Sequence, residues 1–147
     1  MVLKEVVIDA SGLVLGRLAS VVAKRLLMGE RVIIINAEKA LISCNKRKSL
    51  VDRFKERLRK RTHYNPEKTG PKWPRRPDGI VRRTIRGMLP RKTPRGRAAL
   101  KRLRVYIGVP EHYAQAPKET IPEALPKSHR AKYITVAEVA KELGWRP

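Results

Sequence analysis

The chain has 147 residues, a formal net charge of +22 and a sequence pI near 11.1, a composition that indicates a polyanionic partner. Its length suits a single domain over residues 1–147, and its one cysteine excludes an internal disulfide or an all-cysteine zinc site. The sequence has no apolar run of the roughly 20 residues that cross a membrane, and no signal-peptide pattern in MVLKEVVIDA. We therefore expect a soluble, cytoplasmic protein with no membrane partner.

The first third of the chain has the pattern of a strand–helix–strand unit. Residues 3–9 (LKEVVID) and 31–36 (RVIIIN) are short β-branched runs, which predict two buried strands. Between them, apolar residues from Leu15 to Leu26 recur at the spacing of one helix face, and Gly29 stands where a C-cap glycine belongs. A helix that joins two strands in this way makes the strands parallel, with a right-handed crossover.

A basic helix and a proline-rich loop follow a further short strand predicted at residues 40–43. Asn45 is expected to cap a helix over residues 46–61, in which basic side chains surround a narrow apolar stripe. Residues 63–79 contain four prolines, which exclude a regular helix or a central strand. Because a free surface loop of this length is unusual, this proline-rich basic loop is expected to be ordered by a partner.

A second basic helix is predicted over residues 80–89, capped by Asp78 and ended by Pro90. Close packing is expected at Gly87, near the end of this helix. Residues 93–94 (TP) then have the pattern of an N-cap and a first helical proline, which predicts a third basic helix. The apolar residues predicted to face the core from this region are Val81, Ile85, Met88, Leu89, Ala98, Ala99 and Leu103.

The last part of the chain predicts a closing strand, an extended segment and a final helix. Residues 103–107 (LRVYI) are expected to complete the same sheet as the first two strands. Residues 109–134 are rich in proline and predict a segment that lies extended over the surface. Residues 135–144 predict a C-terminal helix, in which Thr135 and Glu138 match a capping box. Together these elements define one α/β domain.

Nearly all of the excess charge lies in the middle of the chain, where residues 46–104 carry 23 Lys/Arg against four Asp/Glu. Like charges at i,i+4 spacing destabilise an isolated helix, and phosphate contacts relieve that repulsion. Arginine outnumbers lysine here, which favours bidentate phosphate contacts and stacking on bases. Tyr64 and Trp73 suit either stacking on unpaired bases or packing within the protein.

The sequence has no helix-turn-helix, zinc-finger or basic-zipper pattern, which favours RNA over DNA. The predicted RNA-binding residues are Arg82, Arg83, Arg86, Arg91, Lys92, Arg95, Arg97, Lys101 and Arg102, with Arg47, Arg53, Arg57, Lys60, Lys72, Arg75 and Arg76 as further candidates.

The sequence lacks the patterns of catalytic and cofactor sites. The turn in residues 9–17 (DASGLVLGR) has neither GxGxxG nor GxxxxGK followed by Ser or Thr, so it is interpreted as a tight strand-to-helix turn. Cys44 is expected to be a small buried residue, and the three histidines lack metal-ligand spacing. We predict no catalytic residue, cofactor, metal or small-molecule substrate. An RNA-modifying enzyme and a DNA-compacting basic protein are the alternatives to a structural RNA-binding protein.

Three motifs in the same order resemble the universal ribosomal protein L13 family of the large subunit. Residues 85–90 (IRGMLP), followed by Gly96 and by residues 103–108 (LRVYIG), resemble the signature of that family. Residues 7–20 (VIDASGLVLGRLAS) and 32–43 (VIIINAEKALIS) are similar to its first strand–helix pair and its second strand. The similarity extends over nearly the whole chain.

The branch of the family that the chain resembles is the archaeal one. HYNPEKTGP, RKTPRGRAALKRLRVYIGVPEHY and YITVAEVAKELGW resemble archaeal and eukaryotic members, and the chain lacks the long helical C-terminal extension of eukaryotic ones. The resemblance implies a small, mostly parallel, Rossmann-like sheet flanked by helices that binds no nucleotide. It also implies a structural, non-catalytic role in the large (50S) ribosomal subunit. The implied partners are 23S rRNA and neighbouring large-subunit proteins, with a part in subunit assembly and translation.

Overall fold

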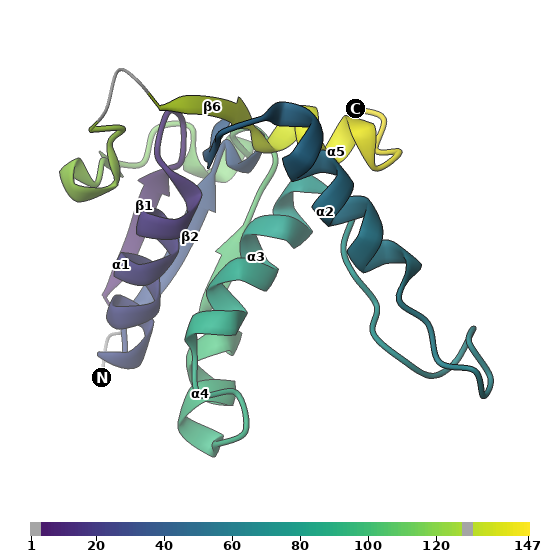
Figure 1. Cartoon of the computed structure of the whole chain (residues 1–147). Helices are drawn as coiled ribbons and strands as arrows, with labels where there is room; N and C mark the ends of the chain where they lie inside the picture. The colour runs from purple at the N-terminus through teal and green to yellow at the C-terminus, as the bar shows by residue number, and fades with distance from the viewer. Residues whose placement is uncertain (1–3, 128–130) are drawn as a thin grey trace.

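The computed structural model describes residues 4–127 and 131–147 and shows a mostly parallel sheet flanked by helices, as predicted (Figure 1). The main sheet has the strand order β4-β2-β1-β5, and each neighbouring pair is parallel. A second, antiparallel pair is formed by β3 and β6. The strands are β1 (Glu5–Asp9), β2 (Arg31–Ile35), β3 (Leu41–Cys44), β4 (Leu103–Val105), β5 (Lys118–Glu119) and β6 (Lys132–Thr135).

The helices α1, α3 and α4 cover one face of the main sheet (Figure 1). The crossover from β1 to β2 and the crossover from β2 to β4 advance in the same direction across the sheet. Because both crossovers are right-handed, they place their helices on the same face. The helices of the described residues are α1 (Leu15–Leu27), α2 (Arg47–Arg59), α3 (Pro77–Met88), α4 (Pro94–Lys101) and α5 (Val136–Glu142), with 3-10 turns η1 (Ala37–Lys39), η2 (Glu111–Tyr113) and η3 (Pro122–Ala124). Among them, no helix is long and apolar enough to cross a membrane.

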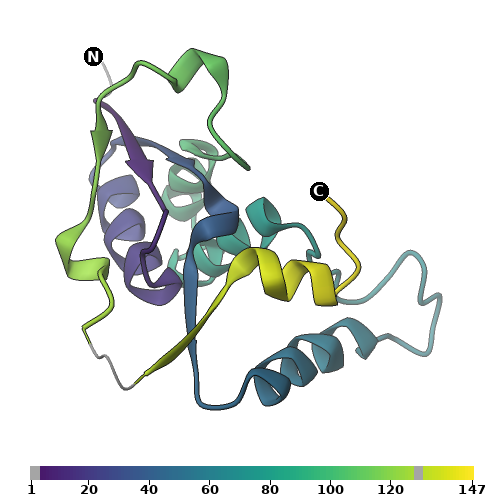
Figure 2. The ribbon, with the colours of Figure 1, turned by 90° about the horizontal axis from the view of Figure 1, so that it is seen from above.

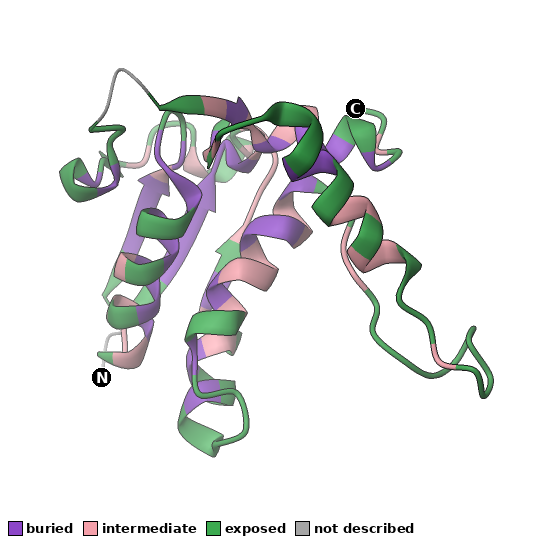
Figure 3. Ribbon diagram, viewed as in Figure 1, coloured by how far each residue is buried: buried purple, intermediate pink, exposed green. Residues whose placement is uncertain are grey.

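The main core lies between the sheet and this helical layer. Alternate strand residues such as Ile8 and Ile34 point to the helices, as the period of two in a strand requires. Leu18 of α1 and Ile85 of α3 meet them, and all four side chains are fully buried. Figure 3 shows the corresponding buried stretches on β1, β2 and the inner sides of the helices. The core is aliphatic, which agrees with the low aromatic content of the sequence.

The opposite face of the sheet is covered by the segment that links β4 to β5. Val7, Ile33 and Ile35 point to this side and pack against Tyr106 and Tyr113, whose rings lie 5.9 Å apart. Figure 2 shows the linking segment on the far side of the sheet from α1. The extended surface segment predicted over residues 109–134 also contains the turns η2 and η3. The segment also supplies β5 and β6, because β1 and β3 each have an edge that accepts a partner strand.

The switch point beside β1, where α/β sheets often bind nucleotides, is filled by the chain itself. Ile121 and Ala124 of the β5–β6 link are buried there. The N–H of Val14, which precedes α1, donates to the carbonyl oxygen of Ala124 at 2.8 Å. The Nη1 of Arg17 donates to the carbonyl oxygen of Leu125 at 3.0 Å. These contacts occupy the entrance to α1.

Several predicted boundaries are corrected. Lys46, without a side-chain cap, precedes α2 in place of Asn45. The helix α3 begins at Pro77 rather than residue 80, because a proline at the first helical position already has helical φ, and Asp78 lies in the first turn. The strand β4 ends at Val105, before residue 107. The predicted Thr93 cap is confirmed, since its Oγ1 accepts from the N–H of Gly96 at 3.2 Å.

The predicted inward faces of α3 and α4 also need correction. Met88 is 43% exposed and Ala98 is exposed, whereas Ile80 and Gly96 are buried. Gly87 is exposed, and a Cβ placed there would meet nothing within 4 Å, so the expectation of close packing is wrong. The first predicted strand begins at Glu5 in the described residues, and residue 3 lies outside them.

The glycine that does need its small size is Gly96. A Cβ added there would collide with the carbonyl oxygen of Pro90. We expect Gly96→Ala to lower the free energy of unfolding by about 1–3 kcal/mol, the usual cost of overpacking. The matched control, Gly87→Ala, is expected to raise it by up to about 1 kcal/mol because alanine is the better helix former. Urea unfolding of both variants checks this, and equal effects would contradict the assignment.

The carboxyl ends of β1 and β2 are joined by a polar contact. Asn36, which is left-handed at φ 53°, donates from Nδ2 to Oδ1 of Asp9 at 3.0 Å, and the Ser11 N–H donates to the same oxygen at 3.0 Å. The left-handed backbone ends β2 at Ile35, one residue before the predicted end. Burial alone would raise the pKa of Asp9, but the hydrogen bonds from Ser11 and Asn36 outweigh it and hold the pKa below the ordinary 3.8.

Asp9 should therefore make stability depend on pH in a defined direction. A carboxylate whose pKa is lower in the folded state stabilises the fold above its unfolded pKa, and that contribution is lost as pH falls through the folded pKa. We expect Asp9→Asn to lower the free energy of unfolding near neutral pH by about 1 kcal/mol. The difference in the free energy of unfolding between Asp9→Asn and the wild type should shrink as pH falls below 3.8. Urea titrations from neutral pH to acid test this, and a constant difference would exclude a role for the charge.

Candidate nucleic-acid interface

A basic arm, formed by α2 and residues 60–76, stands away from the sheet (Figure 1). The buried residues of α2 are Leu50 and Val51, near its start, so the arm is attached to the body mainly at one end. Ion pairs between α2 and α5 add to this attachment, and two of them are closer than 4 Å. They are Arg47 with Glu138 at 3.3 Å and Lys55 with Glu142 at 3.6 Å.

A second attachment of the basic arm is an arginine–tryptophan stack. The guanidinium carbon of Arg83, on α3, lies 4.5 Å from the ring centroid of Trp73, and that of Arg57, on α2, lies 5.2 Å from it. Both distances are within the range of a cation–π contact. Pro74 packs against Gly79 of α3. A Cβ added at Gly79 would lie 2.7 Å from the Cβ of Pro74. Trp73 thus has a packing role, one of the two roles that the sequence left open.

A groove lies between α2 and α3 around this stack. Its volume is about 380 Å³, and its floor includes Phe54, Leu58 and Leu143. Its cationic lining consists of Arg57, Arg83, Arg86 and Arg91, and Gly87 lines it without a side chain. The groove therefore combines an apolar floor with a cationic rim.

The charges at this rim repel one another. Burial, and then the positive charges of Arg86 and Arg91, lower the pKa of Arg83. None of the three arginines forms an ion pair with an acidic side chain of the described residues. A phosphate placed among them would relieve the repulsion and release counterions. The rim is the strongest candidate for an anion site in this part of the molecule.

The same cationic surface continues onto α4. A second hollow, of about 440 Å³, lies between α3 and α4, and Arg86 and Arg91 line both hollows. Arg82, Lys92 and Arg97 complete its basic lining. The basic arm, α3 and α4 therefore form one continuous basic surface, and this name is kept below.

Some predicted RNA-binding side chains are engaged within the protein. Arg82 Nη1 donates to the carbonyl oxygen of Leu103 at 3.0 Å, and Arg102 Nη2 donates to that of Leu26 at 2.7 Å, so both fasten the helical layer. Their contact with RNA stays a prediction. Others with partners of their own are Arg47 (Glu138 and Glu142), Arg57 (Phe54 and Trp73), Arg76 (Asp78) and Lys72 (carbonyls of Pro66 and Glu67).

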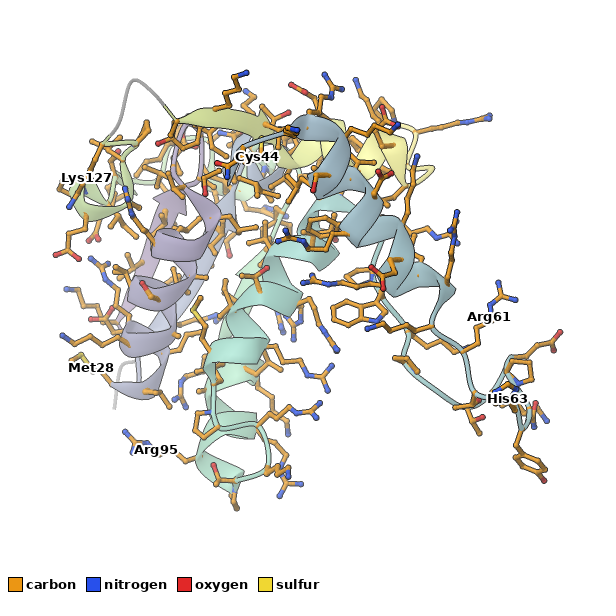
Figure 4. The ribbon with its side chains drawn as sticks, viewed as in Figure 1. Met28, Cys44, Arg61, His63, Arg95 and Lys127 are labelled. Atoms are coloured by element: carbon orange, nitrogen blue, oxygen red, sulfur yellow. The ribbon has the colours of Figure 1, made fainter. Side chains whose placement is uncertain are left out.

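Most of the other predicted residues are exposed to solvent, whereas Arg83 and Arg86 are half-buried. Figure 4 shows Arg95 reaching outward from α4, and Arg61 and His63 projecting from the basic arm. Arg61 is absent from the predicted set, although its place beside Lys60 was a usable signal. Those of the other predicted residues that are exposed and have no ion pair to a described residue are Arg53, Lys60, Arg75, Arg91, Lys92, Arg95, Arg97 and Lys101.

A small α/β domain whose helices carry a continuous arginine-rich surface belongs to the class of nucleic-acid-binding proteins. The family model of Ribosomal protein L13 matches residues 3–112, and the chain belongs to this family. It is 50% identical to large ribosomal subunit protein uL13 of Methanocaldococcus jannaschii, over 94% of this chain and 96% of the relative. The protein of the same name from Archaeoglobus fulgidus is 49% identical, over 95% and 88%. That from Methanosarcina barkeri is 48% identical, over 94% and 96%. The predicted family and its archaeal type are confirmed.

Removal of the Trp73 ring should release residues 60–76 of the basic arm from α2 and α3. Trp73→Ala deletes two cation–π contacts of about 0.5–1 kcal/mol each. A loss of about 1–2 kcal/mol in the stability of the closed state raises the population in which residues 60–76 are detached by roughly 5- to 30-fold. The rate of proteolysis follows that population. We expect trypsin to cleave within residues 57–76 faster by about that factor. Tyr64→Ala, at a residue 83% exposed on the same arm, is the control and should leave the rate unchanged. Equal rates for both variants would show that the stack does not hold the arm.

Proposed function

We propose that this chain is a structural constituent of the large ribosomal subunit and binds 23S rRNA through its basic surface. The observation that carries the proposal is the cluster of Arg83, Arg86 and Arg91, which share a groove and lack acidic partners among the described residues. Such a cluster is unfavourable in the free protein and favourable against a phosphate backbone. The names of the archaeal relatives, large ribosomal subunit protein uL13, support the ribosomal setting.

The fold supports a binding role in which a rigid platform presents the charge. Ile80, Val81 and Ile85 fix one face of α3 in the core, while Arg83 and Arg86 line the groove. Arginines on a fixed helix lose little further freedom on binding, which favours affinity. Neighbouring large-subunit proteins are the further partners expected, and support of subunit assembly is the expected consequence.

Membership of a family of ribosomal proteins makes the chain a structural protein and not an enzyme. A DNA-compacting role would use the same charges but a different polymer. Competition between 23S rRNA fragments and duplex DNA at physiological salt separates the rRNA-binding role from the DNA-compacting role. We expect rRNA to be preferred, and equal competition would favour the DNA role.

Reversal of charge at the groove rim tests the binding surface. We expect the double variant Arg86→Glu with Arg91→Glu to weaken binding to 23S rRNA fragments by more than about tenfold, because each reversed side chain repels the phosphate that it had neutralised. The slope of log affinity against log salt should fall by about 0.7–0.9 for each phosphate that the variant no longer neutralises. Filter binding over a range of KCl concentrations measures both quantities.

The matched control reverses two exposed charges outside the basic surface, Lys24 on α1 and Lys132 on β6, to Glu. It changes the net charge by the same amount. If both double variants lowered the slope equally, the effect would be one of net charge, and the proposed surface would be wrong.

A further inference from the structure

We propose that the groove between α2 and α3 is a pocket for one unpaired nucleobase of the bound RNA. The base would lie against the Arg83–Trp73 stack, with its flanking phosphates on Arg86 and Arg91. This inference rests on the proposed function and specifies what part of the RNA the groove takes. A surface that contacts phosphates alone needs charge but no cavity, so the groove itself is the feature to be explained.

The size and lining of the groove fit a base rather than a phosphate alone. A volume of about 380 Å³ falls within the range of sites for small organic ligands, about 300–1,000 Å³. Phe54, Leu58 and Leu143 give it an apolar floor, which suits a flat aromatic ring and offers nothing to a phosphate. Arg86 and Arg91 line the same groove, so they could neutralise the phosphates on either side of an extruded base.

The stack gives the base a platform. The guanidinium carbon of Arg83 lies 4.5 Å from the centroid of the Trp73 ring, and a guanidinium beside an aromatic ring offers a surface on which a base can stack. The Nε1 of Trp73 is buried without an acceptor among the described residues, and Arg57 and Arg83 both contact the ring. Arg83 has no acidic partner among the described residues, and Arg86 and Arg91 lie beside it, so the phosphates that flank a bound base would supply the countercharge that this guanidinium lacks.

Gly87 keeps the groove open. It lines the groove, and a Cβ placed there would meet no protein atom within 4 Å. The absence of a side chain is thus not required by packing within the protein. A longer side chain at this position would extend into the groove without removing a charge. Its effect on RNA binding would therefore report on the filling of the cavity and not on the loss of a phosphate contact.

Gly87→Leu is therefore the variant that tests the pocket. Its matched control is Gly16→Leu, at an exposed glycine of α1 outside the basic surface, where an added Cβ would also meet nothing within 4 Å. Since stacking of one base contributes roughly 5- to 150-fold in affinity, we expect Gly87→Leu to weaken binding to full-length 23S rRNA within that range. The salt slope should stay unchanged, because the variant keeps every cationic side chain that neutralises a phosphate. Gly16→Leu should bind as the wild type does, and thermal melting of both variants confirms that they fold.

Chemical probing of the same complexes identifies the base. Reagents that attack base edges should find an unpaired nucleotide that the wild-type protein protects and the Gly87→Leu protein leaves reactive. The hydroxyl-radical footprint on the backbone should be the same in both complexes. An unchanged affinity and unchanged base reactivity in the Gly87→Leu complex would overturn the pocket, as would occupation of the groove by a neighbouring protein in the assembled subunit. Failure of the proposed function differs from this, since the wild-type protein would then leave no footprint on 23S rRNA.

Discussion

The structure depends on the burial of one face of α3 against α1 and the sheet. Val81 and Ile85 are fully buried in that contact, and the remaining surface of the same helix carries Arg83 and Arg86. The apolar burial thus fixes the position of the charges, and binding cannot be separated from folding in this region. Arg82 strengthens the link, because it uses its guanidinium to fasten α3 to the carbonyl of Leu103.

The concentration of charge has opposite effects in the free and bound states. In the free protein, Arg83, Arg86 and Arg91 repel one another, and the hydrophobic core offsets that repulsion. A polyanion that binds the folded chain in preference to the unfolded chain stabilises it by mass action. The basic arm, which is attached at one end and by the Trp73 stack, is the part expected to gain most order from the partner.

The strand order explains both the likeness to nucleotide-binding sheets and the difference from them. Right-handed crossovers place the helices of the parallel sheet on one face, as in one half of a doubly wound fold. The segment after β4 then covers the other face with Tyr106 and Tyr113 and fills the switch point with Ile121 and Ala124. Nucleotide binding at that point is replaced by a structural contact within the chain.

The sequence by itself determined the local elements and the sign of the surface. Periodicity and capping residues predicted β1, α1, β2 and the Thr93 and Thr135 caps, because these depend on neighbours a few residues apart. Clustered arginines predicted a polyanion partner, because net charge is additive along the chain.

Only the tertiary structure decided which arginines face a partner and where the groove lies. In the sequence, Arg82 and Arg102 lie in the same basic stretch as Arg86 and Arg91, and nothing local distinguishes them. In the structure, Arg82 and Arg102 donate to backbone carbonyls of other elements. β5, with two residues, is too short for a local signal, and β6 ends a stretch rich in proline; both pair with edges that β1 and β3 offer. The groove forms where α2 and residues 73–74 meet α3, a contact between segments that no local pattern specifies, since it depends on how the whole chain folds.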